Sequence, residues 1–228
     1  MAIKITESAK KKRPVKALKK TNGIKIPHSA ASLDRGIKTT YPVNLRPMLA
    51  KLVDKPFDDE GWTYEVKWDG YRALAYVNNK KTALRSRNNK SFNEKFYPVY
   101  NTLRQWSIKA VIDGEIIVAD ENGLSNFSNL QNWRSEADGY LKFYIFDVLW
   151  YNGYSLLLLP LTERRSILRK IIPADDIVQV SENFEATGTE FFRLAEKMGL
   201  EGIMAKKADS TYSTGIRSKE WLKLKVNK

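Results

Sequence analysis

The sequence predicts an α+β fold with largely antiparallel sheets and flanking helices. Three observations lead to this prediction: strand patterns outnumber helical ones, tight turns join consecutive strands, and helices occur at irregular intervals. A regular alternation of strands and helices would instead indicate a doubly wound parallel sheet. The chain has 228 residues and is 43% hydrophobic, which is enough to bury one sizeable core.

The strand patterns are short and bounded by turn residues. Strands are expected at residues 63–68, 71–77, 81–86, 109–112, 115–119, 142–150, 203–206 and 220–225. The turns between the first three strands are assigned to Asp69-Gly70 and Asn78-Asn79, and Asp113-Gly114 is expected to separate two further strands.

Helices are predicted where apolar residues recur three and four positions apart. This spacing occurs at residues 94–106, 161–170 and 189–198. The helices are therefore expected to flank the sheets and cover their apolar faces.

Basic residues are concentrated at the N-terminus. The formal net charge is +13, and residues 1–28 contain nine lysines and arginines but only one acid, Glu7. We expect residues 1–40 to form a flexible basic arm and residues 41–228 to fold as one domain. The arm is either a DNA-binding segment or a solvated tail. Its candidate DNA contacts are Lys10, Lys11, Lys12 and Arg13.

The composition argues against several kinds of protein and site. Cysteine is absent, which excludes disulfides and thiolate metal sites, and the single His28 argues against a Ser-His-Asp triad. There is no apolar run of the roughly 18 residues that a membrane span needs, nor the apolar segment of a secretory signal. We therefore expect a polyanionic partner and no membrane contact.

The segment EVKWDG at residues 65–70 contains the candidate nucleophile, Lys67. Side chains alternate along a strand, so Glu65 and Lys67 are expected on one face. Gly70 then permits a sharp turn and a close approach of backbone to a ligand. Taken alone, the segment favours a plain surface strand with salt bridges.

Four further segments follow in a fixed order. Asp113-Gly114-Glu115 follows an apolar strand, and an aromatic strand at residues 143–149 (FYIFDVL) contains an acid near its end. An acid precedes the strand at residues 201–206 (EGIMAK), and residues 221–225 (WLKLK) place two lysines on one strand face.

These five segments, in this order, resemble the motif series of the covalent nucleotidyltransferases: ATP-dependent DNA ligases, RNA ligases and messenger-RNA capping enzymes. The resemblance runs from RPMLA at residues 46–50 to Lys225 and is closest to the ligase module of bacterial multifunctional non-homologous end-joining enzymes. It implies a nucleotidyltransferase (ATP-grasp-like) domain. Complete ligases of this kind have an OB-fold domain after the last lysine motif, and we expect that domain to be absent from these 228 residues.

The resemblance also implies a role for each candidate residue. Lys67 attacks the α-phosphorus of ATP and becomes lysyl-AMP, while Glu201 and Glu115 hold Mg²⁺ or Mn²⁺. Lys223 and Lys225 contact the α-phosphate.

Phe146 stacks on adenine. The other nucleotide contacts are assigned to Glu65, Val66, Arg72, Arg87, Glu115 and Met204. Arg87 is also expected to contact DNA. Each residue has an ordinary alternative as well: core packing for Phe146, and surface charges or ion pairs for the acids, arginines and lysines.

The resemblance therefore implies the function of an ATP-dependent DNA ligase adenylation domain in DNA repair by end joining. It also implies a cytoplasmic, nucleoid-associated bacterial protein that is a monomer. AMP would pass from Lys67 to a DNA 5′-phosphate at a nick or break, with the OB-fold domain and end-joining proteins as partners. Two alternatives stay open: an RNA ligase or capping-type nucleotidyltransferase, and a non-catalytic basic DNA-binding module. Trp68 and the RSRN segment at residues 85–88 favour DNA.

Overall fold

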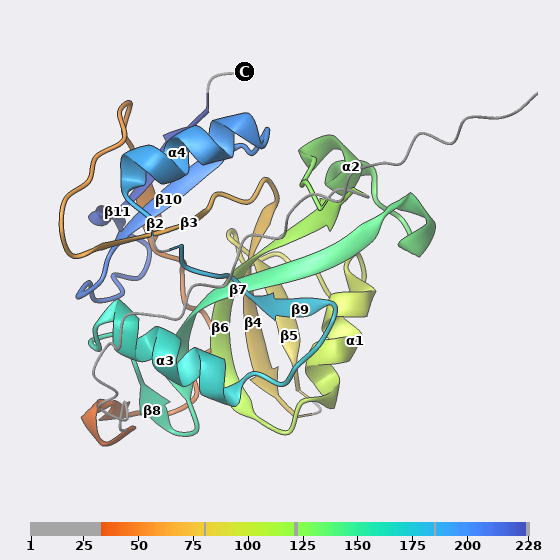
Figure 1. The fold of residues 1–228 in the computed structure, drawn as a ribbon. Helices are drawn as coiled ribbons and strands as arrows, with labels where there is room; N and C mark the ends of the chain where they lie inside the picture. Colours follow the sequence, from red (N-terminus) through yellow and green to blue (C-terminus); the bar gives the residue numbers. More distant parts are fainter. Residues whose placement is uncertain (1–32, 80, 121–122, 185, 227–228) are drawn as a thin grey trace, which may run out of the picture. The chain divides into compact units, whose positions relative to one another are not determined.

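Two sheets organise the folded part of the chain. The computed structural model describes residues 33–79, 81–120, 123–184 and 186–226. The larger sheet has the strand order β1-β8-β7-β6-β4-β5 with β9 beside β7, and the smaller has the order β2-β11-β10-β3 (Figure 1). Among the described strands only the β7–β9 and β2–β11 pairs are parallel. The predicted α+β class with largely antiparallel sheets is confirmed.

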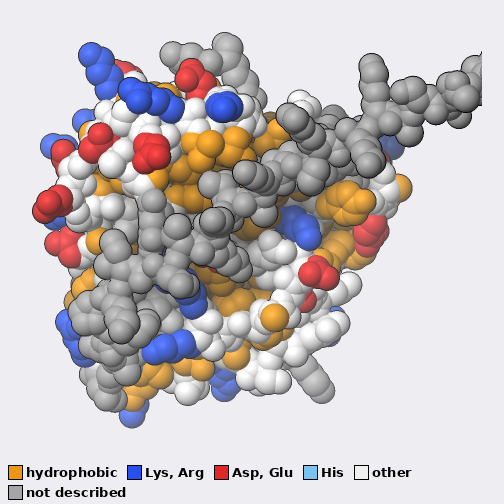
Figure 2. All heavy atoms as spheres, in the orientation of Figure 1, with side chains coloured by type: hydrophobic (Ala, Val, Ile, Leu, Met, Phe, Trp, Pro, Cys, Tyr) orange, Lys and Arg blue, Asp and Glu red, His pale blue; other side chains and the backbone are white. Residues whose placement is uncertain are grey.

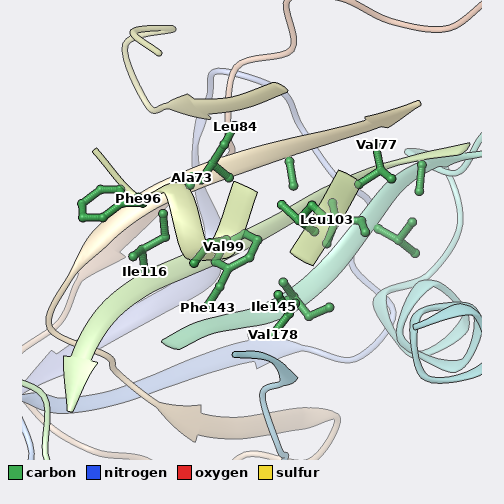
Figure 3. Close-up of a cluster of buried hydrophobic side chains, with 14 of the residues drawn as sticks. Ala73, Val77, Leu84, Phe96, Val99, Leu103, Ile116, Phe143, Ile145 and Val178 are labelled. Atoms are coloured by element: carbon green, nitrogen blue, oxygen red, sulfur yellow. The ribbon is translucent and has the colours of Figure 1, made fainter. Parts of the chain in front are cut away.

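The larger sheet is built mainly from three long, buried strands. Its members are β1 (Ile37–Lys38), β4 (Tyr71–Asn78), β5 (Ala83–Ser86), β6 (Lys109–Ala119), β7 (Tyr140–Tyr151), β8 (Tyr154–Ser155) and β9 (Val178–Val180). Side chains of β4, β6 and β7 form its core with those of helix α1 (Tyr97–Gln105), as Figure 3 shows for Ala73, Val99, Ile116 and Phe143.

The smaller sheet contains β2 (Leu49–Leu52), β3 (Trp62–Val66), β10 (Gly202–Lys207) and β11 (Arg217–Lys225). Helix α4 (Gly188–Lys197) lies over β10 and β3, and helix α3 (Leu161–Ile171) lies along β7 of the larger sheet (Figure 1). A short helix, α2 (Phe127–Asn132), contacts β6.

A second apolar cluster joins the two sheets. It contains Phe146 of β7, Trp221 of β11 and Tyr212 in the loop before β11, and the Phe146 and Trp221 ring centroids lie 6.1 Å apart. Burial of large aromatic rings contributes strongly to packing energy, so this cluster holds the sheets together. The candidate site residues project from both sheets beside this junction.

The prediction of two strands around Asp113-Gly114 is wrong, because β6 runs through both residues without a turn. Asp113 pairs with Leu74 of β4 and with Asp147 of β7, and the strand takes up bulges instead of ending. A Cβ on Gly114 would lie 2.6 Å from the Phe143 ring, so this glycine permits close strand packing.

Other element boundaries also differ from the predicted ones. The strand predicted at 63–68 ends at Val66, because Trp68 leaves the small sheet and stacks on Tyr144 of β7 with ring centroids 3.9 Å apart. Helix α1 begins at Tyr97, where Pro98 fits the first turn without a lost hydrogen bond. The short elements β2, β9 and α2 were not expected, since their few residues carry no clear periodicity.

Part of the predicted arm lies within the described residues. Leu33–Arg35 form a 3₁₀ turn and β1 pairs with β8, whereas residues 1–32 lie outside the described part. The division into an arm at 1–40 and a domain at 41–228 stays a prediction.

The surface of the described residues carries both signs of charge. Acidic and basic side chains are interspersed on the face drawn in Figure 2. No helix among the described residues is long and apolar enough to span a membrane.

Candidate active site

Lys67 lies directly after β3, at the edge of a cavity. Its backbone N–H donates to the carbonyl of Gly202 at 3.1 Å, so the pairing of β3 with β10 extends one residue past the strand. Its ammonium group forms an ion pair with the Glu201 carboxylate. The following turn needs glycine, because a Cβ on Gly70 would overlap the carbonyl oxygen of Ile116 in β6.

Glu201 lies between two lysines at the start of β10. Besides Lys67 it pairs with Lys225 of β11 at 3.3 Å. Gly202 follows with φ +153°, and a Cβ there would overlap the carbonyl oxygen of Leu224. The glycine therefore brings β10 and β11 close enough for Glu201 to reach both lysines.

Most of the predicted nucleotide contacts line one cavity of about 220 Å³. It lies between the two sheets, and its predicted members are Glu65, Val66, Lys67, Arg72, Arg87, Glu115, Phe146, Met204 and Lys223. Glu201 and Lys225 are not among the lining residues of this cavity. Glu201 pairs with Lys67 at the cavity edge, and Lys225 pairs with Glu201. The lining also includes residues the pattern did not single out for nucleotide contact, among them Lys206, Arg217 and Trp221.

The lining is strongly cationic. Six lysines and arginines line the cavity, against the two acids Glu65 and Glu115. Burial and repulsion from Lys67 and Lys225 lower the pKa of Lys223. An excess of clustered positive charge of this kind stabilises a bound polyphosphate.

Arg72 is held rigidly in the cavity wall. Its Nε and Nη2 donate to the two oxygens of the buried Asp113 at 2.5 and 2.6 Å, and Tyr212 donates to the same carboxylate at 2.5 Å. Burial opposes the charge of Arg72, but the Asp113 carboxylate outweighs it and raises the pKa. Bidentate pairing fixes the plane of the guanidinium, which lies 4.6 Å from the Phe146 ring centroid.

Glu115 pairs in register with Arg72 across β6 and β4. Burial raises the pKa of Glu115 to about 7, although the cations of Arg72 and Lys67 act in the opposite direction. A cation placed beside Glu115 would favour its charged form.

No group of three or more His, Cys, Asp or Glu side chains that could hold a metal occurs among the described residues. Magnesium does not need one, because it binds through one or two carboxylates, substrate phosphates and water. Glu115 and Glu201 both interact with Lys67 and offer oxygen donors of this kind, so the residues present fit such an ion.

Glu65 takes a different position from an ordinary surface acid. It is 1% exposed and its carboxylate accepts from Arg165 at 2.8 Å and from Lys206 at 3.0 Å. Burial lowers the pKa of Lys206 to about 8, with Glu65 opposing this shift. Lys206 lies two residues after Met204 on the same strand face, and this spacing could have identified it as a cavity residue. No local sequence pattern identifies Arg165 as a partner of Glu65.

Phe146 is 7% exposed and lies among cations. The ammonium of Lys206 is 4.0 Å from its ring centroid, and the ring also contributes to the junction between the sheets. Phe146 therefore packs in the core and also forms part of the cavity wall. Its stacking on adenine stays a prediction.

Arg87 lies where two cavities meet. It lines the cationic cavity and also a larger one of about 600 Å³, together with Arg46, Asn44, Asn88 and Asn89. No acid lines the larger cavity among the residues that the structure describes. The other predicted DNA contacts, Lys10, Lys11, Lys12 and Arg13, lie outside the described residues.

Comparison with known proteins gives the family of this fold and site. The family described as "ATP dependent DNA ligase domain" matches residues 47–225, which is well over half of the chain.

The chain belongs to the ATP-dependent DNA ligase domain family.

Relatives in this ligase family include end-joining proteins. The multifunctional non-homologous end joining protein LigD of Mycolicibacterium smegmatis is 34% identical over 193 residues, covering 83% of this chain and 25% of that protein. The SPbeta prophage-derived DNA ligase-like protein LigB of Bacillus subtilis is 33% identical over 180 residues, covering 78% of this chain and 66% of that protein. The chain thus spans about a quarter of the LigD relative.

Solved ligase structures have the same fold. The ligase domain of LigD from M. tuberculosis superposes with a TM-score of 0.71 at 33% identity, covering 79% of this chain and 59% of that one. A mycobacterial DNA ligase D complexed with ATP gives a TM-score of 0.69 at 33% identity, covering 79% of this chain and 60% of that one. The predictions of the family, the nucleotidyltransferase fold and an ATP-dependent ligase domain are confirmed.

Proposed function

We propose that Lys67 is the nucleophile that attacks the α-phosphorus of ATP. A phosphoramidate bond forms between Nζ and phosphorus, and pyrophosphate leaves with the electron pair of the broken P–O bond. The observation that carries this proposal is the position of Lys67 on the wall of a cationic cavity that contains Lys223 and Arg72. A solved relative is described as complexed with ATP, which supports the choice of nucleotide.

Glu201 and Glu115 would hold Mg²⁺, which would neutralise the developing charge on the phosphates. The ion pair between Glu201 and Lys67 would keep the Lys67 side chain beside the bound phosphates. Lys223 and Lys225 would stabilise the negative charge on the α-phosphate oxygens.

In the second stage AMP would pass from Lys67 to the 5′-phosphate of nicked or broken duplex DNA. A 3′-hydroxyl would then displace AMP and form the phosphodiester bond. The cavity lined by Arg46 and Arg87 supports this substrate, because its described lining residues include two arginines and three asparagines but no acid. Guanidinium groups suit phosphate oxygens by bidentate bonding.

The place of this chemistry is inferred from the relatives. The LigD relatives are named for non-homologous end joining, which supports a role in DNA break repair in the bacterial cytoplasm beside the nucleoid. An OB-fold domain and end-joining proteins are the proposed partners. They would present the DNA ends to the cavity that contains Lys67.

Covalent labelling tests the first step. Incubation with ATP labelled at the α-phosphate should label the wild-type chain in an acid-labile linkage, and Lys67→Ala should abolish the label because the nucleophile is gone. Lys197→Ala, an exposed lysine at the end of α4, is the matched control and should label normally. Undiminished labelling of Lys67→Ala would overturn the proposal. Labelling by GTP rather than ATP would instead indicate a capping-type enzyme.

A further inference from the structure

A groove of about 540 Å³ lies beside the cationic cavity and is separate from the proposed chemistry. The two hollows share Val66 and Trp68 as walls. In the groove Trp68 stacks on Tyr144 of β7, with ring centroids 3.9 Å apart and an angle of 5° between the rings. The rest of the described lining comes from residues 172–184, which include β9. No step proposed for ATP or DNA uses this groove.

One edge of β9 is open along the groove. Among the described strands β9 pairs only with β7 (Figure 1). The Ser181 N–H donates to the Ile145 carbonyl of β7 at 2.7 Å, so the backbone groups of the preceding Val180 point away from β7. The Val178 N–H points the same way and donates to Asp175 at 2.9 Å. No described residue forms a hydrogen bond with the backbone of Val180.

The end of β3 gives the groove a second open edge. β3 pairs with β10 on one side, where the Lys67 N–H donates to the Gly202 carbonyl at 3.1 Å. Backbone groups alternate in direction along a strand, so those of Tyr64 and Val66 point to the other side. There the Phe184 N–H donates to the Tyr64 carbonyl at 3.0 Å, but no described residue bonds to the backbone of Val66. Open strand edges of this kind can pair with another strand.

The charge of the groove is opposite to that of the two basic cavities. Among the described residues its lining includes Asp175 and Glu182 but no lysine or arginine. Arg169 of α3 interacts with Glu182 but is not a lining residue. In a chain of net charge +13, this groove therefore disfavours a phosphate backbone and favours a cationic partner. The rings of Trp68 and Tyr144 add apolar area and faces that attract cations.

We propose that the groove binds an extended peptide segment of a partner protein, rich in lysine or arginine, as an added strand between the open edges of β9 and β3. Main-chain hydrogen bonds to Val180 and Val66 would hold the segment. Its apolar side chains would pack on the Trp68–Tyr144 stack, and its cations would face Glu182. The segment would also contact the two residues that flank Lys67. This inference goes beyond the proposed ligation chemistry and does not depend on it.

Selection from a display library of random decapeptides tests the groove on the full chain without nucleotide. Enriched peptides should alternate apolar residues with lysine or arginine, and fluorescence anisotropy of a synthetic copy measures Kd. Glu182→Lys should weaken binding roughly tenfold, because it reverses the charge that attracts the peptide. Glu196→Lys, an exposed acid on α4 outside the groove, is the matched control and should bind as wild type does.

The open edge is tested separately by Val180→Pro. This substitution removes the N–H that points away from β7 and leaves the pairing with β7 in place, so binding should weaken roughly fivefold, as for one lost hydrogen bond. Circular dichroism checks that the variant folds. If it does not, copies of the peptide methylated at alternate amide nitrogens remove the same class of bond from the other partner and should bind more weakly.

Three results would overturn the inference. The first is a selection that enriches no peptide, or only peptides without lysine and arginine. The second is a peptide that keeps its full affinity for Glu182→Lys and for Val180→Pro or, where Val180→Pro does not fold, for Glu182→Lys and in the methylated copies. The third is binding of single-stranded oligodeoxythymidine that Val180→Pro weakens, which would assign the groove to nucleic acid. Failure of covalent labelling by ATP would contradict only the proposed function, since peptide binding is measured without nucleotide.

Discussion

At the scale of single residues, the buried acid Asp113 fixes the orientation of the Arg72 guanidinium. Asp113 is fully buried and accepts both guanidinium bonds of Arg72 as well as the Tyr212 hydroxyl. Breaking a buried pair is much more harmful than never forming it, because one charge stays buried without its partner. Arg72 can therefore keep one orientation in the cavity only while Asp113 is ionised.

Asp113→Asn should destabilise the protein by about 3–5 kcal/mol, because it preserves volume but removes the charge facing Arg72. Urea unfolding followed by circular dichroism measures this loss. Asp209→Asn is the control: Asp209 is 72% exposed and lies 3.4 Å from Lys207, so its loss should change stability by less than about 1 kcal/mol. Equal effects of the two variants would contradict this account.

Lys206 should make stability depend on pH. Burial lowers its pKa to about 8, so between pH 8 and 10.5 the folded state binds fewer protons than the unfolded state. Stability from this group therefore rises with pH across that window, while below pH 8 both states are protonated and the full penalty of burial applies. The charged groups that face Lys206 are Glu65, Arg165 and Asp147.

Lys206→Met should remove this pH dependence. The free energy of unfolding of wild type, relative to the variant, should rise by up to about 1.4 kcal/mol per pH unit between pH 8 and 10. Denaturant titrations at pH 7, 8, 9 and 10 provide the curves. Lys207→Met, at a neighbouring lysine whose side chain is 44% exposed, should give a curve parallel to that of wild type. Parallel curves for Lys206→Met would show that Lys206 does not titrate in this window.

At the scale of secondary-structure elements, glycines set how closely strands approach around Lys67. Gly70 lies against β6 and Gly202 lies against β11, and neither site has room for a Cβ. Close packing of β10 on β11 brings Glu201 to Lys67 and Lys225. The strand pairing itself therefore sets the geometry around Lys67.

Gly202→Ala should separate β10 from β11 and lower the melting temperature. The substitution adds a clash with the Leu224 carbonyl to a backbone strain of about 1–3 kcal/mol at φ +153°. Gly153→Ala is the matched control, because its φ is +99° but no atom lies within 4 Å of the added Cβ. The first variant should lose more stability than the second and also slow covalent labelling by ATP. Similar losses of stability in the two variants would mean that backbone strain, and not separation of β10 from β11, causes the destabilisation.

At the scale of the whole molecule, residues of both sheets form the cationic cavity. The smaller sheet contributes Met204 of β10, Lys223 of β11 and, directly after β3, Lys67. The larger sheet contributes Arg72 of β4, Glu115 of β6 and Phe146 of β7. A ligand in this cavity contacts both sheets and should stabilise the whole fold, since it binds only the folded state. The larger basic cavity adjoins it through Arg87, so a DNA strand held there would lie near Lys67.

Salt dependence tests the proposed DNA surface. Arg46→Ala and Arg87→Ala should each weaken binding of a nicked duplex and reduce the slope of log K against log salt by about one, because each removes one phosphate contact. Fluorescence anisotropy of the full chain at several salt concentrations measures the slope. Lys170→Ala, exposed on α3, should leave it unchanged. Unaltered slopes for both arginine variants would exclude this cavity as the DNA path.

The sequence by itself determined the family, the fold class and the identity of most candidate site residues. These features are local: a strand with Lys67, a glycine turn after it, and acids and lysines at strand ends. Alternation along a strand places such residues on one face without further information. The helices at 161–170 and 189–198 were predicted to within one residue of their ends for the same reason.

Only the tertiary structure decided which charges are buried and what they hold. The sequence around Glu65 is that of a surface acid, yet Glu65 pairs with Arg165, which lies 100 positions further along the chain. Arg72 likewise pairs with Asp113, which lies 41 positions away. Asp113-Gly114 has the sequence of a turn, yet both residues continue β6, where Arg72 of the neighbouring strand β4 pairs with the Asp113 carboxylate. Ionisation, burial and strand continuity depend on which residues, distant in the sequence, lie together in the interior. Local periodicity contains no information about these long-range contacts.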